Sequence, residues 1–310
     1  MVLGVDTSCY RTSLALADAG GIVAQAGRLL DVPEGARGLR QSDALFQHVK
    51  RLPALMEEMM AGAQGAVDAV AFSEKPRPAD DSYMPVFMAG TSLAKSVAAL
   101  LHVPQIATTH QQGHLRAALV GTDLEKDFVA VHLSGGTTEI LRVGDGLDIR
   151  LLGGTADISA GQLVDRTGVA LGLGFPAGPG LEALAERGEP RSILPVSVRG
   201  MQASFSGAEA AVMRLIESGA AAENVAAEVY SLLARTLARL VSQAAGATGL
   251  TDVLLAGGVA SSGLLRALLP ERLRRLNEAV RVQWARPELS GDNAAGVALI
   301  GCDHLKEGCA

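Results

Sequence analysis

The sequence predicts an α/β fold built from two related halves, each with a sheet covered by helices. Segments 2–17 and 128–143 share one pattern, in which two apolar runs flank a short turn of small and polar residues. This pattern is typical of two strands joined by a tight turn. Further apolar runs alternate with amphipathic segments along the chain, which is typical of sheets covered by helices. The long spacing between the two copies indicates two halves and excludes a solenoid.

The expected elements follow in chain order. An amphipathic helix is expected over 43–60, where Pro53 predicts a break or kink. A long amphipathic helix in the second half should end near Gly249. The remaining predicted elements are strands within 67–76, 104–110 and 251–259, and helices over 89–101, 261–276 and 292–308.

Composition and charge limit the class of protein. The 310 residues are 48% apolar and 19% charged, as in a globular protein with a large core. The net charge is −6 and aromatic residues make up 3%, so neither autonomous nucleic-acid binding nor a base-stacking platform is favoured. The short stretch Arg272, Arg274 and Arg275 favours a solvated helix face. If RNA is a substrate, a partner or a local basic patch must supply the positive charge.

The cysteines and the N-terminal segment indicate the compartment. Cys9, Cys302 and Cys309 form an odd set without paired spacing, which favours reduced thiols in a cytoplasm. The first residues are typical of a strand and not of a signal peptide, and no apolar run is long enough to cross a membrane. We therefore expect a cytoplasmic protein.

Two histidines have the spacing of a metal site. His110 and His114 are four residues apart, which places both imidazoles on one face of a helix. Gln111 stands where a zinc protease of the HExxH type needs its Glu base, so proteolysis is disfavoured. A carboxylate from elsewhere is needed to complete a site. Asp292 is a candidate for that ligand, or for the cap of the helix that follows it.

Several glycine-rich turns could hold a phosphate. Gly135 and Gly136 follow a strand, and the hydroxyls of Ser134, Thr137 and Thr138 flank them; such a turn can expose backbone N–H groups to an anion, or only reverse a hairpin. Segment 6–8 could form a facing turn. Gly257 and Gly258 follow another buried strand, at a point where open α/β sheets bind ligands.

Other residues admit two interpretations each. Gly178 opens a helix whose free N–H groups could face a ligand, or it lies in an ordinary loop. Asp165 could accept hydrogen bonds from ribose hydroxyls, or pair with Arg166 or solvent. Ser204 and Ser206 lie near a helix start, where capping is the expected role.

Taken together, the motifs resemble one family. VLGVDTSC, HQQGHL, LSGGTTEI, AGQLVDRTGVALGLGFPAGPGLEAL, SFSG, LAGGVASSGLLR and GDNAAGVA occur in family order and span nearly the whole chain. They resemble the tRNA N6-adenosine threonylcarbamoyltransferase (TsaD) family, once described as glycoproteases. The resemblance implies the two-lobed actin-like, sugar-kinase-like ATPase fold with a duplicated βββαβα core. We expect one lobe over 1–107 with 292–310 and a second over 108–291.

The resemblance also implies an activity and its ligands. The family transfers threonylcarbamoyl from threonylcarbamoyl-AMP to N6 of adenosine 37 in tRNAs that read ANN codons, which is an acyltransferase reaction. Its expected partners are a smaller actin-like paralogue and a P-loop ATPase. By resemblance, one iron or zinc ion is bound by His110, His114 and Asp292. ATP or the acyl-adenylate is bound by Leu133, Ser134, Gly135, Gly136, Thr137, Asp165, Gly178 and Ser262.

Four positions differ from the family pattern. Tyr10 and Arg11 stand where the family usually has Asp-Glu, Thr137 where it has His, and Ser262 where it has Asn. These departures leave open a divergent paralogue that binds metal and nucleotide as a non-catalytic scaffold or regulator. A small-molecule kinase of the same fold is a further alternative.

Overall fold

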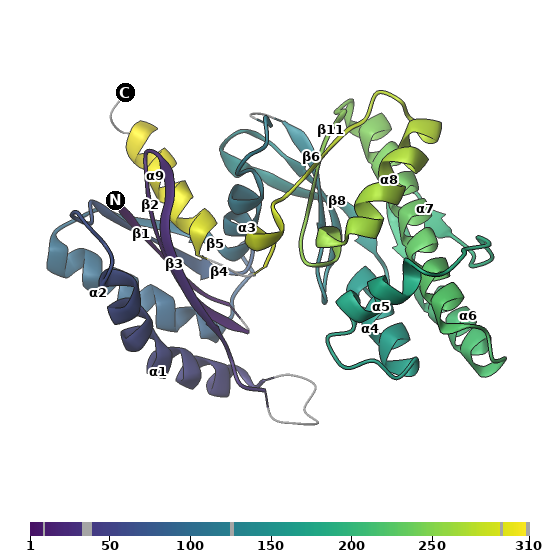
Figure 1. Cartoon of the computed structure of the whole chain (residues 1–310). Coiled ribbons are helices and arrows are strands. Elements are labelled where there is room, and N and C mark those ends of the chain that lie inside the picture. Colours follow the sequence, from purple (N-terminus) through teal and green to yellow (C-terminus); the bar gives the residue numbers. More distant parts are fainter. Residues whose placement is uncertain (9, 33–38, 125–126, 292–293, 308–310) are drawn as a thin grey trace. The chain divides into compact units, whose positions relative to one another are not determined.

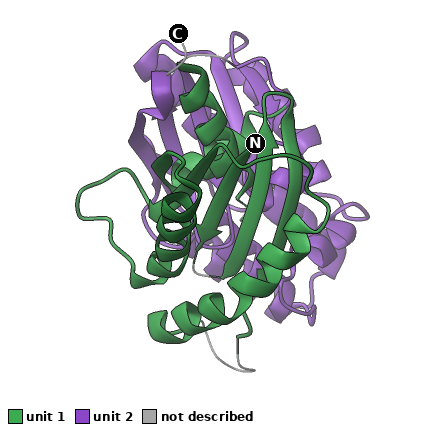
Figure 2. Cartoon of the chain, turned by 90° about the vertical axis from the view of Figure 1, so that its left-hand side faces the viewer, with its two compact units in different colours: residues 1–120, 291–310 green, residues 121–290 purple. Residues whose placement is uncertain are grey.

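The computed structural model describes every residue except 9, 33–38, 125–126, 292–293 and 308–310 (Figure 1). Contacts divide the chain into two compact units (Figure 2). Unit 1 comprises Met1–Val120 and Gly291–Ala310, and unit 2 comprises Gly121–Ser290. The predicted histidine helix therefore belongs to unit 1.

Unit 1 is built around a five-stranded sheet in the order β3-β2-β1-β4-β5. Strand β2 is antiparallel to both of its neighbours, β3 and β1, whereas β4 and β5 run parallel to β1. The strands are β1 (Val2–Thr7), β2 (Arg11–Asp18), β3 (Gly21–Leu29), β4 (Ala69–Lys75) and β5 (Gln105–Thr109). All six residues of β1 are buried, which explains why the sequence shows a continuous apolar run there.

Helices cover both faces of this sheet. Leu3 and Val5 of β1 belong to a core cluster with Leu52 of α1 (Gln41–Met60) and Ala94 of α2 (Met88–Leu101). Gly4 points to the opposite face, as strand geometry requires, and α9 (Ala295–Glu307) approaches it so closely that a Cβ there would lie 2.6 Å from the Ala298 nitrogen. Helix α3 (His110–Ala118) packs on α9, and a short 3₁₀ helix, η1 (Pro85–Phe87), precedes α2.

Helix α1 continues through Pro53, so the predicted break at that residue is wrong. Proline in a helix interior removes one backbone hydrogen bond, a cost that packing must offset. Leu52, Leu55 and Met59 are all buried around the proline. The apolar face of α1 therefore determines its length.

Unit 2 contains a seven-stranded sheet in the order β12-β11-β6-β7-β8-β10-β9. Strand β6 pairs antiparallel with β7 and parallel with β11, and β7 pairs antiparallel with β8. The strands are β6 (Phe128–Leu133), β7 (Thr138–Val143), β8 (Ile149–Thr155), β9 (Ser197–Arg199), β10 (Gln202–Ser204), β11 (Asp252–Ala256) and β12 (Arg281–Trp284). The five strands β8-β7-β6-β11-β12 repeat the order and directions of β3-β2-β1-β4-β5. This repeat confirms the predicted duplicated core.

Helix α7 (Ala222–Thr248) is central to unit 2. Most of its residues are buried, and it ends at Gly249, which adopts the left-handed conformation expected of a glycine C-cap. The other helices are α4 (Ala160–Ala170), α5 (Gly178–Ala185), α6 (Ser206–Glu217) and α8 (Gly263–Leu276), with 3₁₀ turns η2 (Asp145–Leu147), η3 (Val259–Ser261) and η4 (Pro287–Leu289). Among the described residues, no helix has the length and apolarity needed to cross a bilayer.

Candidate functional site

The predicted histidine pair in unit 1 lies at the start of α3. Thr109 caps this helix in a capping box with Gln112, which fixes the first helical turn where His110 lies. The Nε2 atoms of His110 and His114 are 2.9 Å apart, and the rings meet edge to face with centroids separated by 4.3 Å. The i, i+4 spacing has therefore brought the two imidazoles together, as expected.

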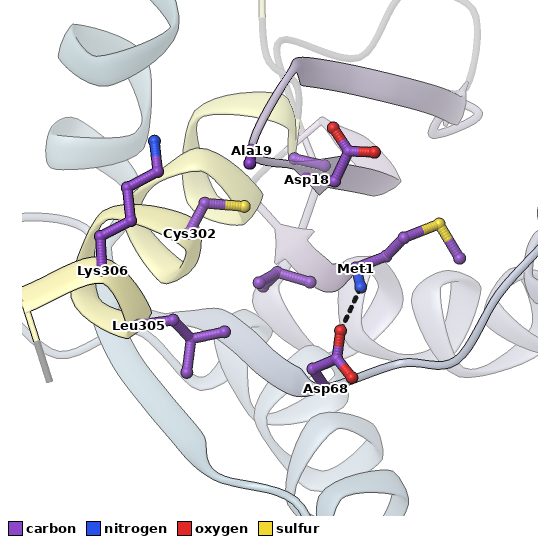
Figure 3. A pocket seen from close by; sticks show the side chains of 9 residues that line it. Met1, Asp18, Ala19, Asp68, Cys302, Leu305 and Lys306 are labelled. Atoms are coloured by element: carbon purple, nitrogen blue, oxygen red, sulfur yellow. Dashed lines mark hydrogen bonds and ion pairs between the residues drawn. The ribbon is translucent and has the colours of Figure 1, made fainter. Parts of the chain in front are cut away.

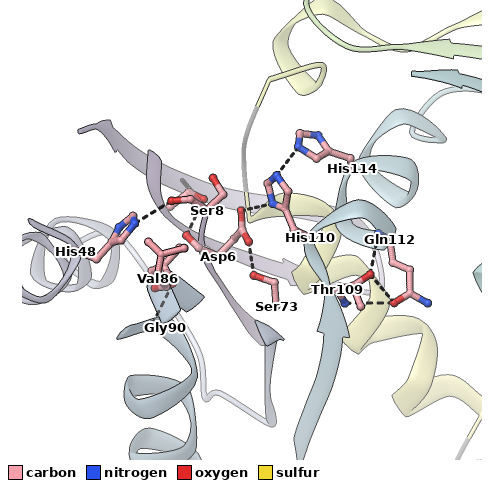
Figure 4. A network of polar contacts seen from close by, with 12 residues as sticks. Asp6, Ser8, His48, Ser73, Val86, Gly90, Thr109, His110, Gln112 and His114 are labelled. Atoms are coloured by element: carbon pink, nitrogen blue, oxygen red, sulfur yellow. Dashed lines mark hydrogen bonds and ion pairs between the residues drawn. The ribbon is translucent and has the colours of Figure 1, made fainter. Parts of the chain in front are cut away.

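Asp6 orients the first of these histidines. Its carboxylate is fully buried at the end of β1, and Oδ2 accepts a hydrogen bond from His110 Nδ1 at 2.9 Å. Ser73 of β4 donates to the other carboxylate oxygen (Figure 4). A proton held on Nδ1 leaves Nε2 with a lone pair, which is the arrangement that carboxylate–histidine–metal sites use. The sequence indicated a turn at 6–8 but not this role of Asp6.

The pair fits two of the ligand positions of a metal ion. Metal–nitrogen bonds of about 2.1 Å at tetrahedral angles would place two ligand nitrogens roughly 3.4 Å apart, so a small opening of the pair suffices. Asp292, the third expected ligand, lies outside the described residues. Within the part of the chain that the structure describes, no group of three or more His, Cys, Asp and Glu side chains could hold a metal. The described part of the proposed metal site therefore consists of two imidazoles and a carboxylate that orients one of them.

A further histidine, which is buried and which sequence reasoning missed, supports the β1–β2 turn. His48 of α1 is fully buried, its Nε2 donates to the Ser8 carbonyl at 2.8 Å, and its Nδ1 accepts from the Thr12 hydroxyl at 2.7 Å (Figure 4). Burial lowers the pKa of His48, an effect that the bond to Ser8 and the charge of Asp6 partly oppose. The neutral ring thus ties α1 to both ends of the turn.

The glycine turn of unit 2 joins β6 to β7. The Ser134 N–H donates to the Thr137 carbonyl at 2.9 Å, and the Thr137 N–H donates to Ser134 Oγ at 3.0 Å. Gly135 and Gly136 are exposed, and a Cβ on either would meet no atom within 4 Å. The turn therefore has a closed backbone and open space beside its two glycines, as a phosphate-binding turn requires.

Two neighbouring segments hold this turn in place. Ser159, which caps α4, donates to the Gly135 carbonyl at 2.7 Å. Gly257 follows β11 with a φ of +102°, and a Cβ there would lie 2.2 Å from the Leu133 carbonyl oxygen. Only glycine combines that backbone conformation with that approach. The turns after β6 and β11 therefore lie side by side.

Ser262 serves as the N-cap of α8. Its Oγ accepts from the Leu265 N–H at 3.1 Å and donates to Glu182 Oε1 at 2.8 Å. The Leu264 N–H donates to the same Glu182 oxygen at 2.8 Å. Sequence reasoning missed Glu182, although it lies one helical turn after Gly178, a spacing that is a usable signal.

Asp165 and Gly178 are linked through the start of α5. Asp165 Oδ1 accepts from the Ala177 N–H at 2.8 Å, and the Gly178 carbonyl accepts from the Tyr230 hydroxyl at 3.3 Å. Burial, together with the charges of Glu182 and Asp165, raises the pKa of Tyr230. Arg166 pairs with Glu209 and not with Asp165. The predicted nucleotide residues of unit 2 therefore fall into two groups, one at the β6–β7 turn and one around α5 and α8.

Helix α6 is capped by Asp157 and not by Ser204 or Ser206, which were the predicted capping residues. Asp157 accepts from the Phe205 N–H at 2.8 Å, the Ser206 N–H at 3.1 Å and the Ser204 hydroxyl at 2.5 Å. Although burial acts to raise it, these hydrogen bonds hold the pKa of Asp157 well below its usual range. Ser204 and Ser206 are therefore donors to a capping carboxylate.

Comparison with known proteins decides the family. Residues 35–299 match the family model of tRNA N6-adenosine threonylcarbamoyltransferase. The chain is 34% identical to the enzyme so described from Aromatoleum aromaticum, over 97% of this chain and 90% of the relative. It is 32% identical to the one from Methylobacillus flagellatus, over 99% of this chain and 94% of the relative. The chain belongs to the tRNA N6-adenosine threonylcarbamoyltransferase family.

Solved structures show the fold of this family member. A ROK hexokinase from Thermus thermophilus superposes with a TM-score of 0.58 at 15% identity, over 99% of each chain. The activator of 2-hydroxyisocaproyl-CoA dehydratase from Clostridium difficile, with bound ADPNP, superposes with a TM-score of 0.56 at 15% identity, over 99% of this chain and 96% of that one. These likenesses confirm the predicted actin-like, sugar-kinase-like fold.

The two residues that depart from the family pattern at the β1–β2 turn have different surroundings. Tyr10 is about half exposed. The Arg11 guanidinium lies against Gly27 of β3, where a Cβ would be 2.6 Å from Arg11 Nε. That Nε is buried and has no hydrogen-bond partner in the described structure. Arg11 therefore packs along the sheet of unit 1.

A separate cavity of about 330 Å³ lies in unit 1 away from the histidine pair. It is lined by Met1, Val2, Ala17, Asp18, Ala19, Asp68, Cys302, Leu305 and Lys306, and the Met1 amine pairs with Asp68 at its edge (Figure 3). Burial, followed by the charge of Asp303, raises the pKa of the Cys302 thiol. The cavity therefore contains a protonated thiol and mainly apolar walls, which gives it no reactive group.

Proposed function

We propose that this chain transfers the threonylcarbamoyl group of threonylcarbamoyl-AMP to N6 of adenosine 37 in tRNAs that read ANN codons. The N6 nitrogen forms a bond to the carbamoyl carbon, the bond from that carbon to the AMP phosphate oxygen breaks, and N6 gives up one proton. The observation that carries the proposal is the full-length kinship to threonylcarbamoyltransferases, in a chain whose histidine pair is oriented by a buried carboxylate. Such a reaction belongs in the cytoplasm, and the free, buried Cys302 is in keeping with that location.

His110 and His114, with Asp292, would hold one iron or zinc ion. Such an ion supplies a Lewis acid that polarises a carbonyl oxygen. The contribution of this chain is to hold both Nε2 atoms on one side of α3 and to keep the His110 proton on Nδ1 through Asp6. Binding and orientation of this kind lower the barrier of a reaction whose donor is already activated.

The nucleotide part of the donor would lie against unit 2. The open space beside Gly135 and Gly136 suits its phosphate, because neither glycine carries a side chain that would fill it. Asp165 and Glu182 are carboxylates that accept hydrogen bonds, as ribose recognition requires.

A smaller actin-like paralogue and a P-loop ATPase would assist the reaction. Helix α1 offers a surface for the paralogue, because Phe46 and Val49 are 64% and 56% exposed one turn apart on a helix whose other face is buried. Exposed apolar pairs of this kind mark protein interfaces. Phe46→Asp should abolish co-purification of the paralogue while leaving the thermal midpoint of the isolated chain unchanged.

Transfer assays on histidine variants test the proposal. His110→Ala and His114→Ala should each lower transfer to tRNA by at least tenfold, since each removes one of two described ligands. His102→Asn, which replaces an exposed histidine at the left-handed C-cap of α2, is the control and should retain activity. Full transfer by metal-free protein would refute the role of the pair.

A non-catalytic scaffold remains the second candidate. The departures from the family pattern at Tyr10, Arg11, Thr137 and Ser262 favour this candidate. Complementation of a cell depleted of its own transferase separates the two candidates, because rescue requires catalysis. Turnover of ATP with small acceptors would indicate a kinase instead.

A further inference from the structure

We propose that an arginine patch on α7 and α8, formed by Arg235, Arg239 and Arg272, binds the phosphodiester backbone of RNA. The inference rests on the proposed function, because tRNA is the acceptor named there. It adds a contact surface on unit 2 that the sequence did not indicate. From the sequence, the arginines of α8 were interpreted as a solvated helix face. The structure adds two arginines from α7, the helix against which α8 packs.

The patch is built by two packed helices. Arg235 and Arg239 are four residues apart on α7 and therefore share a face. Helix α8 packs along α7 and carries Arg272 (Figure 1). The charges of Arg272 and Arg239 both act on Arg235 and lower its pKa, in keeping with the packing of α8 on α7.

The three arginines form no close ion pair with a described carboxylate. Arg235 donates only to neutral carbonyls, from Nε to Ser231 at 3.3 Å and from Nη2 to Leu194 at 2.9 Å. Arg272 Nε is buried and has no hydrogen-bond partner in the described part of the chain. No ion pair within 4 Å joins any of the three to a described carboxylate. In a chain with 33 acidic and 27 basic residues, these arginines therefore lie on a surface without close carboxylate partners among the described residues.

The arrangement costs free energy in the isolated chain. Burial lowers the pKa of Arg235, Glu228 raises it, and the charges of Arg272 and Arg239 lower it further. The charge of Glu228 therefore compensates part of the repulsion at Arg235, although its two oxygens accept from the backbone N–H groups of Arg191 and Ile193. Like charges that are partly removed from water repel each other, and a bound anion relieves that repulsion.

Phosphodiesters fit this patch better than isolated carboxylates do. Guanidinium groups bind phosphate through paired N–H donors, and a row of them matches a chain of regularly spaced anions. The overall charge of −6 disfavours attraction of RNA by the molecule as a whole, so binding needs a local surface of this kind. An acidic protein surface is the competing occupant, and the experiment separates the two.

Salt-dependent binding tests the inference. Binding of a fluorescent tRNA transcript to the full chain is followed by anisotropy from about 50 to 200 mM KCl. The variant is Arg239→Gln/Arg272→Gln, which spares the more deeply packed Arg235. The matched control is Arg150→Gln/Arg281→Gln, which removes two exposed arginines that are paired with Asp148 and Asp252. Fluorescence of Trp284 and the thermal midpoint verify that both variants are folded.

The expected result is a flatter salt dependence for the patch variant alone. Loss of two phosphate contacts should reduce the slope of log Kd against log salt by about 1.4 to 1.8 and weaken binding roughly tenfold at low salt. Equal slopes for the patch variant and the control, or no RNA binding by the wild type, overturn the inference. The inference is also overturned if the patch variant no longer binds an acidic protein partner but binds RNA as tightly as the wild type does.

Transfer activity separates this inference from the proposed function. If the wild type transfers threonylcarbamoyl while the slopes are equal, only the patch inference fails. If the slopes differ as expected but no transfer occurs with any tRNA, the patch stands and the proposed reaction fails. At saturating tRNA the patch variant should transfer at the wild-type rate, since its loss is in binding.

Discussion

His48 should make the stability of unit 1 fall in mild acid. The ring is fully buried, and Nδ1 accepts a hydrogen bond from Thr12, so protonation would remove that bond and bury a charge. Burial lowers the pKa of His48 from its ordinary value of 6.5. The unfolded chain therefore binds the proton more readily than the folded one, and the stabilisation is present above pH 6.5 and lost as the pH falls toward the lowered pKa.

The loss of unfolding free energy depends on the difference between the pKa of His48 in the unfolded and in the folded chain. Each pH unit between the unfolded and folded pKa values corresponds to about 1.4 kcal/mol. Between pH 7.5 and 5.5, the wild type should lose about 1 to 1.4 kcal/mol through this group. His48→Leu removes the titrating ring, so it should be less stable at pH 7.5, by roughly 2 to 4 kcal/mol for two lost buried hydrogen bonds, but without this added pH dependence.

Hydrogen exchange measured at both pH values provides the assay. Exchange of the β1 and β2 amides reports the free energy of opening of unit 1, after correction for the intrinsic rate. Trp284 is the single tryptophan and lies in unit 2, so its fluorescence monitors the other unit. If wild type and variant lose the same free energy between the two pH values, the reasoning about His48 is wrong.

Three further predictions concern glycines and Asp6. Gly257→Ala should destabilise unit 2 by at least about 2 kcal/mol, because its φ is +102° and the new Cβ would lie 2.2 Å from a carbonyl oxygen; urea unfolding followed by Trp284 fluorescence measures the loss. Gly136→Ala should leave stability unchanged, since its Cβ meets no protein atom, yet weaken binding in an ATP titration by occupying the open space. Asp6→Asn should weaken zinc binding by about 10- to 100-fold in competition with a chelator, because His110 loses its charged acceptor.

The first of these predictions has a control variant, and each of the other two has an outcome that would contradict it. Gly258→Ala adds the same methyl group beside Gly257 at a negative φ with no atom within 4 Å, and it should be nearly neutral. Wild-type ATP affinity in Gly136→Ala would argue against a phosphate at that turn. Unchanged zinc affinity in a folded Asp6→Asn protein would show that His110 needs no orienting carboxylate.

The sequence predicted the strand pairs and the main helices because buried strands appear as apolar runs and half-buried helices as amphipathic segments. The apolar runs around the turns at Ser8 and at Gly135 correspond to β1–β2 and β6–β7. The break that was one of two predictions at Pro53 is wrong because local helix propensity favours it, whereas the burial of the residues around Pro53 comes from tertiary packing. Short strands such as β9 and β10, with three residues each, have too little pattern to be recognised.

The site shows the same division between local and long-range information. The His110–His114 spacing is local and was readable, whereas Asp6 reaches His110 across 104 positions of sequence. Glu182 and Ser262 meet across 80 positions, so nothing in either motif alone indicates their bond. The arginine patch likewise needs two helices that are separate in sequence. The proposed metal and nucleotide remain predictions that the experiments above address.

The place of α9 in unit 1 has a consequence for the order of folding during synthesis. Unit 2 is one continuous segment, whereas unit 1 needs α9 to cover the face of β1 that Gly4 leaves open. The ribosome makes α9 only after all of unit 2, so unit 2 can fold first and the earlier-made unit 1 must wait. Until then, the sheet of the first-made half presents an uncovered apolar face, which is the surface that a chaperone would recognise in a nascent chain.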